Sequence, residues 1–572
     1  MKAGRKPPRF PSEAPEGSPL ETSGLVALGL VVVAGAALWV AGELSGRIFG
    51  GAWPSTDPVE MGGVLARFPG NAANPARAWP APQRGLIPGP TAFFGTLALL
   101  LSPLIAVGLV VLRRRLSRGH EEAGARWARL RDLRPLIVSR SRKGRLTLGE
   151  VDGRLVAAEP RQSVIVVGPV QTGKTSGFAV PAILEWQGPV VATSVKTDLL
   201  EDTIAARETI SDAHVWIYDP TGGTGRPPAT WTPLAGCGTW LGAQRMAAWL
   251  SAAAQPRNAG IESAEFWYAA TAKLLAPLLF AAAVTERTMA DVVRWVDSQE
   301  LEEVYDALET ADERAALTAF QASALRDDRT RSGVYTTTET VLAAYADPGV
   351  LASAAGSDLR PECLLDGGYH TAYLCAPAHE QRRLQPLFAT LVQEIVACAY
   401  ERATQSKHPL DPPLLVVLDE CANIAPLRDL ATLASTSAGQ GIQLVSIFQD
   451  MGQINTVYGR DRAHTIVTNH RAKVILSGVA DAQTLDYVAR LLGDEEVRQI
   501  SSTSGAEGRR STTESVAYRS LAPANVLREM HPGQGVLIYG HLPPARIALR
   551  PWFENRLLRA RVNGSQPVRA LP

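Results

Sequence analysis

A phosphate-binding loop carries the clearest chemistry in this 572-residue chain. Residues 168–175 read G-P-V-Q-T-G-K-T and fit the pattern G-x-x-x-x-G-K-[ST] at every fixed position. An apolar, β-type run at residues 163–167 precedes the loop, as this motif requires. Glycines let backbone N–H groups turn toward phosphates at the start of a helix, so we predict that the chain binds ATP here. The expected contacts are Gly168, Pro169, Val170, Gln171, Thr172, Gly173, Lys174, Thr175 and Ser176.

Two acidic residues supply the hydrolytic chemistry that such a loop needs. The aliphatic run at residues 414–418 ends in Asp419 and Glu420. An acid at this end of a buried strand holds Mg²⁺ in P-loop enzymes, and we expect Asp419 and the Thr175 hydroxyl to be its ligands. Lys174 is expected to reach the β- and γ-phosphates, and Glu420 to polarise the attacking water as general base.

Gln449 is the third predicted catalytic residue, beside Lys174 and Glu420. It follows a strand-like run at residues 443–448, so it would face the nucleotide from the neighbouring strand of a parallel sheet. There it could sense the γ-phosphate. The alternative, a solvated strand end with no role, stays open on the pattern alone.

The wider pattern predicts the elements that hold these residues. Strand-like runs alternate with helical stretches, which indicates a mainly parallel α/β sheet. Residues 242–345 are rich in Ala and Leu and contain no strand-like run, so they predict an all-α domain inserted into the α/β fold. Further strand candidates lie at residues 189–193, 214–218, 371–375, 472–476 and 536–539.

Two uncharged stretches near the N-terminus predict a transmembrane hairpin. Residues 24–42 and 91–112 are each close to or above the roughly 20 residues that cross a bilayer core. Basic residues precede the first stretch and follow the second, so both ends belong in the cytoplasm and the loop at residues 43–90 outside. A signal-peptide h-region would be shorter, and a hydrophobic hairpin inside a soluble fold is the remaining alternative. We therefore expect a multi-pass membrane protein whose main domain is cytoplasmic.

Composition adds few constraints. The net charge of +1 indicates no overall basic or acidic partner, and five scattered cysteines show no metal-ligand spacing. Arginines of the all-α region could contact nucleic acid or form an ordinary solvated face: Arg294, Arg326, Arg329 and Arg331. The Ser/Thr-rich residues 501–515 predict an exposed loop.

The predicted domain organisation follows from these patterns. A cytoplasmic tail (1–23) leads into the hairpin (24–112) and a juxtamembrane linker (113–145). The nucleotide-binding domain comes in two parts, 146–241 and 346–554, on either side of the all-α domain at 242–345, and a basic, frayed tail (555–572) ends the chain.

The motifs and their order resemble the coupling ATPases of type IV secretion and conjugation, the TraG/TraD family. Companions of the phosphate loop are S-V-K-T-D-L at 194–199, Y-D-P-T-G at 218–222, W-T-P-L at 231–234, Phe266-Trp267, L-D-E at 418–420, Gln449 with Gln453, Tyr458-Gly459 and H-L-P-P at 541–544. The resemblance implies a RecA-like domain and a ring-shaped homo-hexamer at the inner membrane. It also implies ATP-driven delivery of a DNA–relaxase complex, with single-stranded DNA, to the components of a secretion channel.

One departure from that family concerns an arginine. Members often carry it about eleven residues before the position of Gln449, where it can act on a neighbour's nucleotide as an arginine finger. Here residues 435–440 read S-T-S-A-G-Q. The nearest downstream arginines are Arg460, Arg462 and Arg471, and the sequence does not choose among them.

Two other functions remain compatible with the sequence. The first is a double-stranded DNA translocase of the FtsK type, although no three-helix pattern for a winged-helix module follows Gly493. The second is a membrane receptor that binds ATP without hydrolysing it and docks secretion substrates. The missing arginine favours the receptor, whereas the intact Lys174, Asp419 and Glu420 favour an enzyme.

Overall fold

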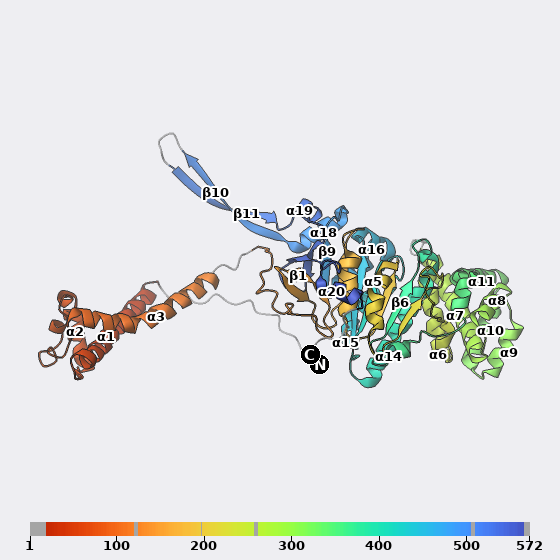
Figure 1. The fold of residues 1–572 in the computed structure, drawn as a ribbon. Helices are drawn as coiled ribbons and strands as arrows, with labels where there is room; N and C mark the ends of the chain where they lie inside the picture. Colours follow the sequence, from red (N-terminus) through yellow and green to blue (C-terminus); the bar gives the residue numbers. More distant parts are fainter. Residues whose placement is uncertain (1–18, 119–123, 196, 257–260, 505–509, 565–572) are drawn as a thin grey trace, which may run out of the picture. The chain divides into compact units, whose positions relative to one another are not determined.

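The computed structural model describes residues 19–118, 124–195, 197–256, 261–504 and 510–564. The chain forms two compact units, Met1–Glu121 and Glu122–Pro572 (Figure 1). Several predicted features lie outside the described residues: the basic residues before the first span (Lys2, Arg5, Lys6 and Arg9), Lys196 of the 194–199 motif, and the end of the basic tail.

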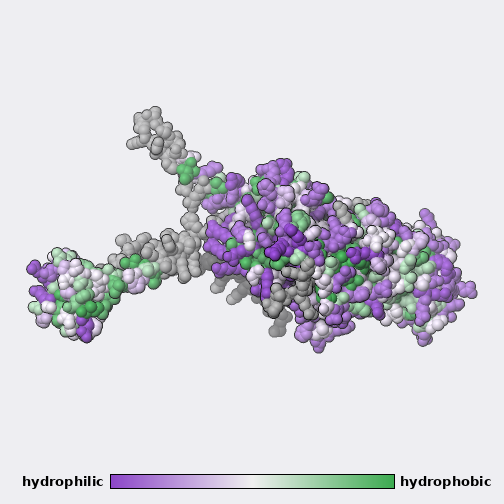
Figure 2. Space-filling view, viewed as in Figure 1, coloured by the Kyte–Doolittle hydropathy of each residue, from purple (hydrophilic) through white to green (hydrophobic). Residues whose placement is uncertain are grey.

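Two long helices of the first unit coincide with the predicted spans. Helix α1 is Pro19–Phe49 and helix α3 is Pro90–Arg118. The stretch Pro90–Gly108 is long and apolar enough to cross a membrane, and only 12% of it is buried within the unit. Leu99, Ile105 and Val107 are each more than half exposed on α3, where hydrophobic surface is visible in Figure 2. An apolar helix surface of this kind fits contact with lipid.

The segment between these helices has a small core of its own, although we expected an irregular loop. It contains helix α2 (Met61–Arg67) and short 3-10 turns, and its Trp79 is fully buried together with Phe93 of α3. The Trp79 ring packs so closely on α1 that a Cβ at Gly42 would lie 2.5 Å from it. Trp79 is therefore a core residue of a folded cap, with Phe68 packed against it, whereas Trp53 is exposed.

An eleven-stranded sheet organises the second unit. Seven strands are parallel neighbours in the order β9-β3-β8-β7-β4-β6-β5, and an antiparallel extension, β2-β1-β13-β12, pairs with β9. The parallel strands are β3 (Val164–Val167), β4 (Val190–Ser194), β5 (Val215–Tyr218), β6 (Thr371–Cys375), β7 (Leu414–Leu418), β8 (Ile442–Phe448) and β9 (Ala472–Leu476). The other four are β1 (Thr147–Val151), β2 (Arg154–Ala157), β12 (Gln534–Tyr539) and β13 (Ala545–Ala548). Every predicted strand is present.

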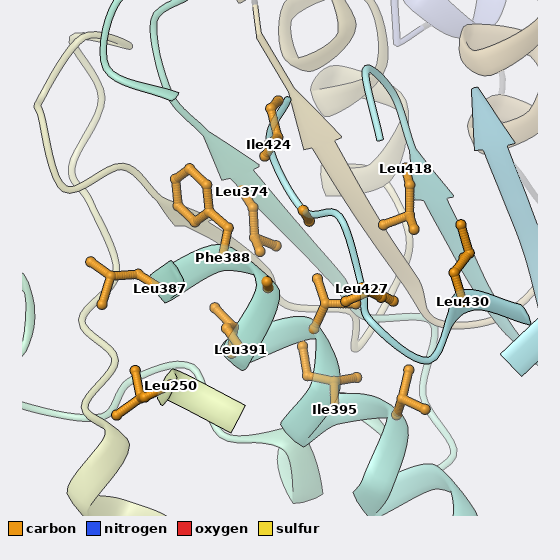
Figure 3. Close-up of a cluster of buried hydrophobic side chains, with 14 of the residues drawn as sticks. Leu250, Leu374, Leu387, Phe388, Leu391, Ile395, Leu418, Ile424, Leu427 and Leu430 are labelled. Atoms are coloured by element: carbon orange, nitrogen blue, oxygen red, sulfur yellow. The ribbon is translucent and has the colours of Figure 1, made fainter. Parts of the chain in front are cut away.

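Helices cover both faces of this sheet, which explains its continuous aliphatic runs. One face packs on α4 (Val180–Glu185) and α5 (Thr197–Glu208). The other packs on α14 (Gln381–Ser406), whose Leu387, Leu391 and Ile395 lie among side chains of β6, β7 and the loop after β7 (Figure 3). Further helices beside the sheet are α15 (Leu430–Gln440), α16 (Met451–Tyr458), α17 (Arg460–Asn469), α18 (Ala482–Leu492) and α19 (Ala524–Arg528).

The predicted all-α region is helical throughout its described residues. It comprises α6 (Trp240–Ala254), α7 (Ile261–Val284), α8 (Met289–Asp297), α9 (Glu302–Thr310), α10 (Arg314–Ala324) and α11 (Asp328–Leu342). Within α7, the stretch Ala264–Val284 is also long and apolar, but 61% of it is buried. We therefore interpret α7 as the core helix of this region, whose outer surface is mostly hydrophilic in Figure 2.

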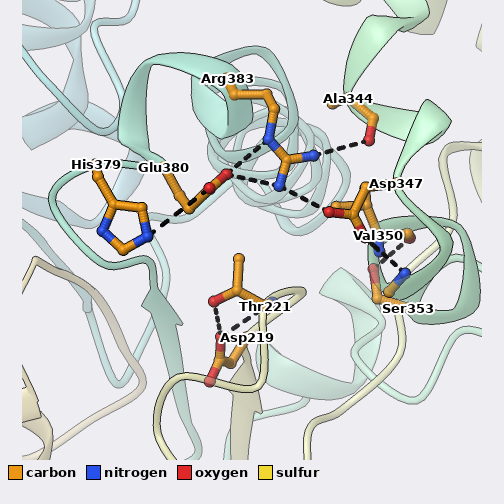
Figure 4. A network of polar contacts seen from close by, with 10 residues as sticks. Asp219, Thr221, Ala344, Asp347, Val350, Ser353, His379, Glu380 and Arg383 are labelled. Carbon is orange, nitrogen blue, oxygen red and sulfur yellow. Dashed lines mark hydrogen bonds and ion pairs between the residues drawn. The ribbon is translucent and has the colours of Figure 1, made fainter.

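Polar contacts join the end of the helical region to α14, which packs on the sheet (Figure 4). Arg383, at the start of α14, donates to Glu380 at 2.6 Å and to Asp347 at 3.1 Å. Asp347 also accepts from the backbone N–H of Gly349 and so caps α12 (Pro348–Ser353). On the sheet side, Asp219 accepts from the hydroxyl of Thr221 at 2.8 Å. The helical region is thus part of one continuous core rather than a loosely tethered module.

Three local expectations were wrong. The described part of residues 501–515, expected as a loop, lies on two long antiparallel strands, β10 (Asp494–Ser504) and β11 (Arg510–Ser520), whose Thr, Val, Ile and Tyr residues favour strands. The tail from Asn555 forms helix α20 (Arg556–Val562) because Asn555 caps it and Leu558 is buried. The part of the expected linker after residue 124 packs into the second unit, where Leu133 and Leu136 are core residues.

A buried carboxyl group gives a prediction about stability. Burial raises the pKa of Glu394 on α14 from 4.5 to about 7, and its hydrogen bond from the Trp231 indole opposes this rise. The folded state then holds a proton that the unfolded state releases, so the free energy of unfolding falls as pH rises from about 4.5 to about 7. Glu394→Gln should remove this loss, which is worth roughly 1–3 kcal/mol.

The measurement is the thermal unfolding midpoint of the full chain in detergent at pH values on both sides of this window. Glu401→Gln is the control, because Glu401 lies on the same helix but forms an exposed pair with Arg245. The stability of Glu394→Gln relative to the unmodified chain should increase with pH. If the unfolding midpoints of Glu394→Gln and the unmodified chain changed in parallel with pH, Glu394 would not be the buried group that takes up the proton.

Candidate nucleotide-binding site

The order of three strands brings the predicted site residues together. Strand β8 lies between β3 and β7 and is parallel to both, with Val167 opposite Phe448 and Leu418 opposite Ser446. The carboxyl ends of these strands therefore share one edge of the sheet. Gly168, Asp419 and Gln449 follow directly at that edge, where α/β proteins bind their ligands.

The backbone of the phosphate loop has the conformation that its glycines predict. Gly173 is left-handed, with φ of 88°, and Gln171 also has a positive φ, 66°. Gly168 donates its N–H to the carbonyl of Phe448 at 3.1 Å, and the Thr172 hydroxyl donates to the carbonyl of Pro169 at 2.9 Å. The loop then enters a π-helical turn, Lys174–Ala179, before α4. Val170 is exposed at its tip.

Lys174 lies across this loop. Its side chain is only 7% exposed, and its ammonium group donates to the carbonyl of Gly168 at 2.7 Å. The ammonium is also 3.9 Å from the carboxylate of Glu420. Burial lowers the pKa of Lys174, while the charges of Glu420 and Asp419 oppose this effect. A single cation is thus held between the loop and two acids, within reach of a phosphate bound by the loop.

Thr175 and Asp419, the two predicted metal ligands, are in contact. The Thr175 hydroxyl donates to the Asp419 carboxylate at 3.0 Å, and Thr193 donates to the Asp419 backbone carbonyl at 2.9 Å. Burial raises the pKa of Asp419 to about 6, and the Thr175 hydrogen bond opposes the rise. A hydroxyl and a carboxylate are oxygen donors of the kind that Mg²⁺ prefers, so this pair fits that ion.

Glu420 is held by amide side chains on both of its carboxylate oxygens. Asn423 donates to one of them at 3.0 Å, and the side chain of Gln449 donates to the same oxygen at 3.1 Å and to the other at 3.4 Å. The backbone of Glu420 is left-handed, with φ of 52°, which turns the chain sharply after β7. Gln449 therefore contacts the predicted base, and it lies at the edge of the sheet where a nucleotide would bind.

Sequence reasoning missed several residues of this neighbourhood. Asn423 stands three residues after Glu420, and its position in a tight turn was the available signal. The segment after β13 was not anticipated: Leu549 packs against Gly173 and Gly177, and Trp552 donates its N–H to the carbonyl of Ser176 at 3.1 Å. This C-terminal segment covers the start of the helix that follows the phosphate loop.

The three arginines that the sequence offered as a substitute finger lie in different places. Arg471 precedes β9, at the opposite edge of the sheet from Gly168, and it pairs with Glu159 at 3.1 Å. Arg460 and Arg462 begin α17, on the chain that continues from Gln449. Both line a pocket with Arg428, which follows Glu420 by eight residues.

Comparison with known proteins points to one family. A sequence profile described as Type IV secretory system Conjugative DNA transfer matches residues 127–570. The conjugal transfer protein TraG of Agrobacterium fabrum (strain C58 / ATCC 33970) is 24% identical over 406 residues, which are 68% of this chain and 60% of that protein. Protein VirD4 of the same organism is 24% identical over 503 residues, 80% of this chain and 70% of that protein. The chain thus matches between 60% and 70% of the length of these relatives.

Solved coupling proteins have a similar fold. The bacterial conjugative coupling protein TrwBdeltaN70, in an unbound monoclinic form, has a TM-score of 0.58 and 18% identity over 75% of this chain and 92% of its own. The plasmid coupling protein TrwB in complex with ADP and Mg²⁺ has a TM-score of 0.57 and 19% identity, over 75% of this chain and 94% of its own. In both cases the likeness in fold extends over three quarters of this chain.

The close packing of the phosphate loop predicts the effect of one substitution. A Cβ at Gly168 would lie 2.8 Å from the Cβ of Leu476 and 2.9 Å from the Thr172 hydroxyl oxygen, so Gly168→Ala must displace the loop. We expect its affinity for a fluorescent ATP analogue with Mg²⁺ to fall at least about tenfold, because misplaced N–H groups lose their hydrogen bonds to phosphate.

Gly439→Ala is the matched control, because a Cβ at that helical position would meet nothing within 4 Å. It should bind the analogue like the unmodified chain. Equal affinity for Gly168→Ala and Gly439→Ala would show that the nucleotide binds elsewhere.

Proposed function

Because this chain belongs to the Type IV secretory system Conjugative DNA transfer family, we propose that it is a membrane-anchored coupling ATPase. In this proposal it recruits a DNA–relaxase or protein substrate and uses ATP hydrolysis to deliver it to a type IV secretion channel. The observation that carries the proposal is the meeting of Lys174, Thr175, Asp419, Glu420 and Gln449 at one edge of the parallel sheet.

ATP with Mg²⁺ is the proposed substrate complex. Backbone N–H groups of the loop and the Lys174 ammonium would bind the phosphates, and the Lys174 side chain would exchange the Gly168 carbonyl for a phosphate oxygen. Thr175 and Asp419 would hold the cation, whose chemistry is to neutralise charge on the β- and γ-phosphates. The TrwB structure with ADP and Mg²⁺ supports this choice of ligand.

Glu420 is the proposed base for hydrolysis. It would accept a proton from the attacking water as the water oxygen bonds to the γ-phosphorus and the bond to the ADP oxygen breaks. Asn423 and Gln449 hold the Glu420 carboxylate from two sides, so they would fix its direction toward that water. When the γ-phosphate leaves, Gln449 would move with Glu420. Because Gln449 lies just before α16, this movement would shift that helix.

Movement of the substrate needs more than one subunit and an anchor. We propose a homo-hexameric ring, in which each nucleotide lies at a subunit boundary and hydrolysis shifts neighbouring subunits. Helices α1 and α3, which contain the two predicted spans, would anchor the ring in the inner membrane, with the second unit in the cytoplasm. Single-stranded DNA with its relaxase and the channel components are the proposed partners.

One observation favours a second candidate function. Ala438 occupies the position where related ATPases often carry an arginine finger, a group worth roughly 10³–10⁵ in rate. A chain without a substitute would bind ATP and dock substrates without turnover, as a membrane receptor.

Two substitutions test the proposed site in the full chain in lipid nanodiscs. Lys174→Ala should abolish ATP hydrolysis, because it removes the cation that the loop directs at the phosphates. Glu420→Gln should bind ATP normally and lose at least about 100-fold in turnover, because the amide cannot accept the proton. Phosphate release, measured alone and with single- or double-stranded DNA, is the assay.

The outcomes separate the candidate functions. Stimulation by single strands supports the coupling ATPase, whereas preference for duplex supports a translocase of the FtsK type. ATP binding with no turnover under any condition supports the receptor. Normal turnover in Lys174→Ala would remove residues 168–175 as the hydrolytic site.

A further inference from the structure

A pocket of about 430 Å³ lies between the helical region and the loops that leave the candidate nucleotide site. Its walls come from the end of α6, the start of α7, the loop after Glu420 and the junction of α16 with α17. Three arginines line it: Arg428, Arg460 and Arg462. Arg460 and Arg462 are neighbours at the start of α17, and Arg428 lies on a separate loop, so the fold has gathered three cations at one place.

The charge of this pocket is not neutralised by its own acids. Glu265 and Asp461 also line it, but within the described residues none of the three arginines forms an ion pair. Burial lowers the pKa of Arg428 and the neighbouring Arg462 lowers it further, whereas Asp429 and Glu265 raise it. Arginines this close together repel each other, and a bound phosphate would reduce that repulsion by supplying negative charge.

Both segments that carry the arginines begin at the candidate hydrolytic residues. The loop from Glu420 reaches Arg428 after eight residues, and the segment from Gln449 passes through α16 (Met451–Tyr458) to Arg460 at the start of α17. At their starting points the two segments are joined, because Gln449 donates to Glu420 at 3.1 Å. A ligand that pulled on Arg428 and Arg460 would therefore act on the side chains that face the phosphate loop.

We propose that this arginine pocket binds the phosphodiester backbone of a single-stranded nucleic acid, and that its occupation speeds ATP hydrolysis through Glu420 and Gln449. The proposal rests on the coupling function proposed above and names the surface at which the strand is held. Guanidinium groups suit phosphate because they offer paired donors in one plane. Tyr458, Val457 and Pro426 line the same pocket and supply surface for sugars and bases.

A strand fits these observations better than a nucleotide held by a second copy of the chain. The pocket is much larger than one phosphate group and combines three spaced cations with apolar walls, as binding of a repeating sugar-phosphate chain requires. The helical region forms one of its walls, and the segments that follow Glu420 and Gln449 form the others.

The test replaces the three arginines together, as Arg428→Gln, Arg460→Gln and Arg462→Gln, in the full chain in nanodiscs of neutral lipid. Binding of a fluorescein-labelled oligothymidylate is followed by anisotropy between about 50 and about 200 mM salt. We expect affinity to fall at least about tenfold at the lower salt concentration and the salt slope to shrink by roughly 2, which is about 0.7 for each lost phosphate contact. Stimulation of phosphate release by the same oligonucleotide should disappear.

The matched control removes three exposed arginines elsewhere on the second unit: Arg154→Gln, Arg314→Gln and Arg382→Gln. Its net charge equals that of the pocket variant, so a general charge effect would appear equally in both. Binding of a fluorescent ATP analogue reports that each variant is folded. The control should bind the oligothymidylate like the unmodified chain.

Two results would overturn the proposal. Unchanged oligothymidylate affinity and salt slope in the pocket variant would exclude the pocket as a strand-binding surface. Loss of hydrolysis without DNA, while strand binding is unchanged, would assign the arginines to a nucleotide held by a second copy. Strand binding is measured without hydrolysis, so it tests the pocket independently. If the chain never hydrolysed ATP, the coupling-ATPase proposal would fail, and the binding assay would still show whether the pocket holds the strand.

Discussion

The parallel pairing of β8 with both β3 and β7 is the constraint on which the candidate site depends. Hydrogen bonding in register along these strands fixes where each one ends, and Gly168, Asp419 and Gln449 are the residues that follow those ends. Substituting a core residue in β8 would therefore move the loop, the acids and the amide relative to one another. The strands are buried on both faces, so the edge is held by the two large clusters of the core. The chemistry needs this rigidity because proton transfer depends on the placement of groups to within fractions of an ångström.

Burial gives the charges of the site their strength. Lys174 and Asp419 are almost completely buried. Lys174 donates a hydrogen bond to the Gly168 carbonyl, and Asp419 accepts one from the Thr175 hydroxyl. Desolvation opposes the charge of both groups, which raises the pKa of Asp419 and lowers that of Lys174. A phosphate and a divalent cation would satisfy these two groups together, so binding of one favours binding of the other. The arginine pocket is a similar case. Within the described residues its three arginines form no ion pair, and they lie on the segments that follow Glu420 and Gln449.

Local sequence patterns predicted what depends on nearby residues, and missed what depends on contacts between distant ones. The phosphate loop, the acids after residues 414–418, the seven parallel strands and β12 were recognisable, because turn residues and aliphatic runs report local structure. Strands β1, β2 and β13 were not predicted. The position of β8 between β3 and β7 is set by long-range packing, so the contact of Gln449 with Glu420 was not predictable from the sequence. The ribbon of β10 and β11 was mistaken for a loop because its Ser/Thr content is also typical of turns. The packing of Leu549 on the phosphate-loop helix joins segments nearly 400 residues apart and leaves no local pattern.

The central claim is that ATP and Mg²⁺ bind at the edge formed by β3, β8 and β7. A structure of the full chain with a non-hydrolysable ATP analogue and Mg²⁺, determined by electron cryo-microscopy, tests it most directly. The account predicts that the Lys174 ammonium leaves the Gly168 carbonyl for the β- and γ-phosphates, and that the cation contacts the Thr175 hydroxyl and the Asp419 carboxylate. A nucleotide bound away from residues 168–175, or one bound there while Lys174 still donates to Gly168, would contradict it.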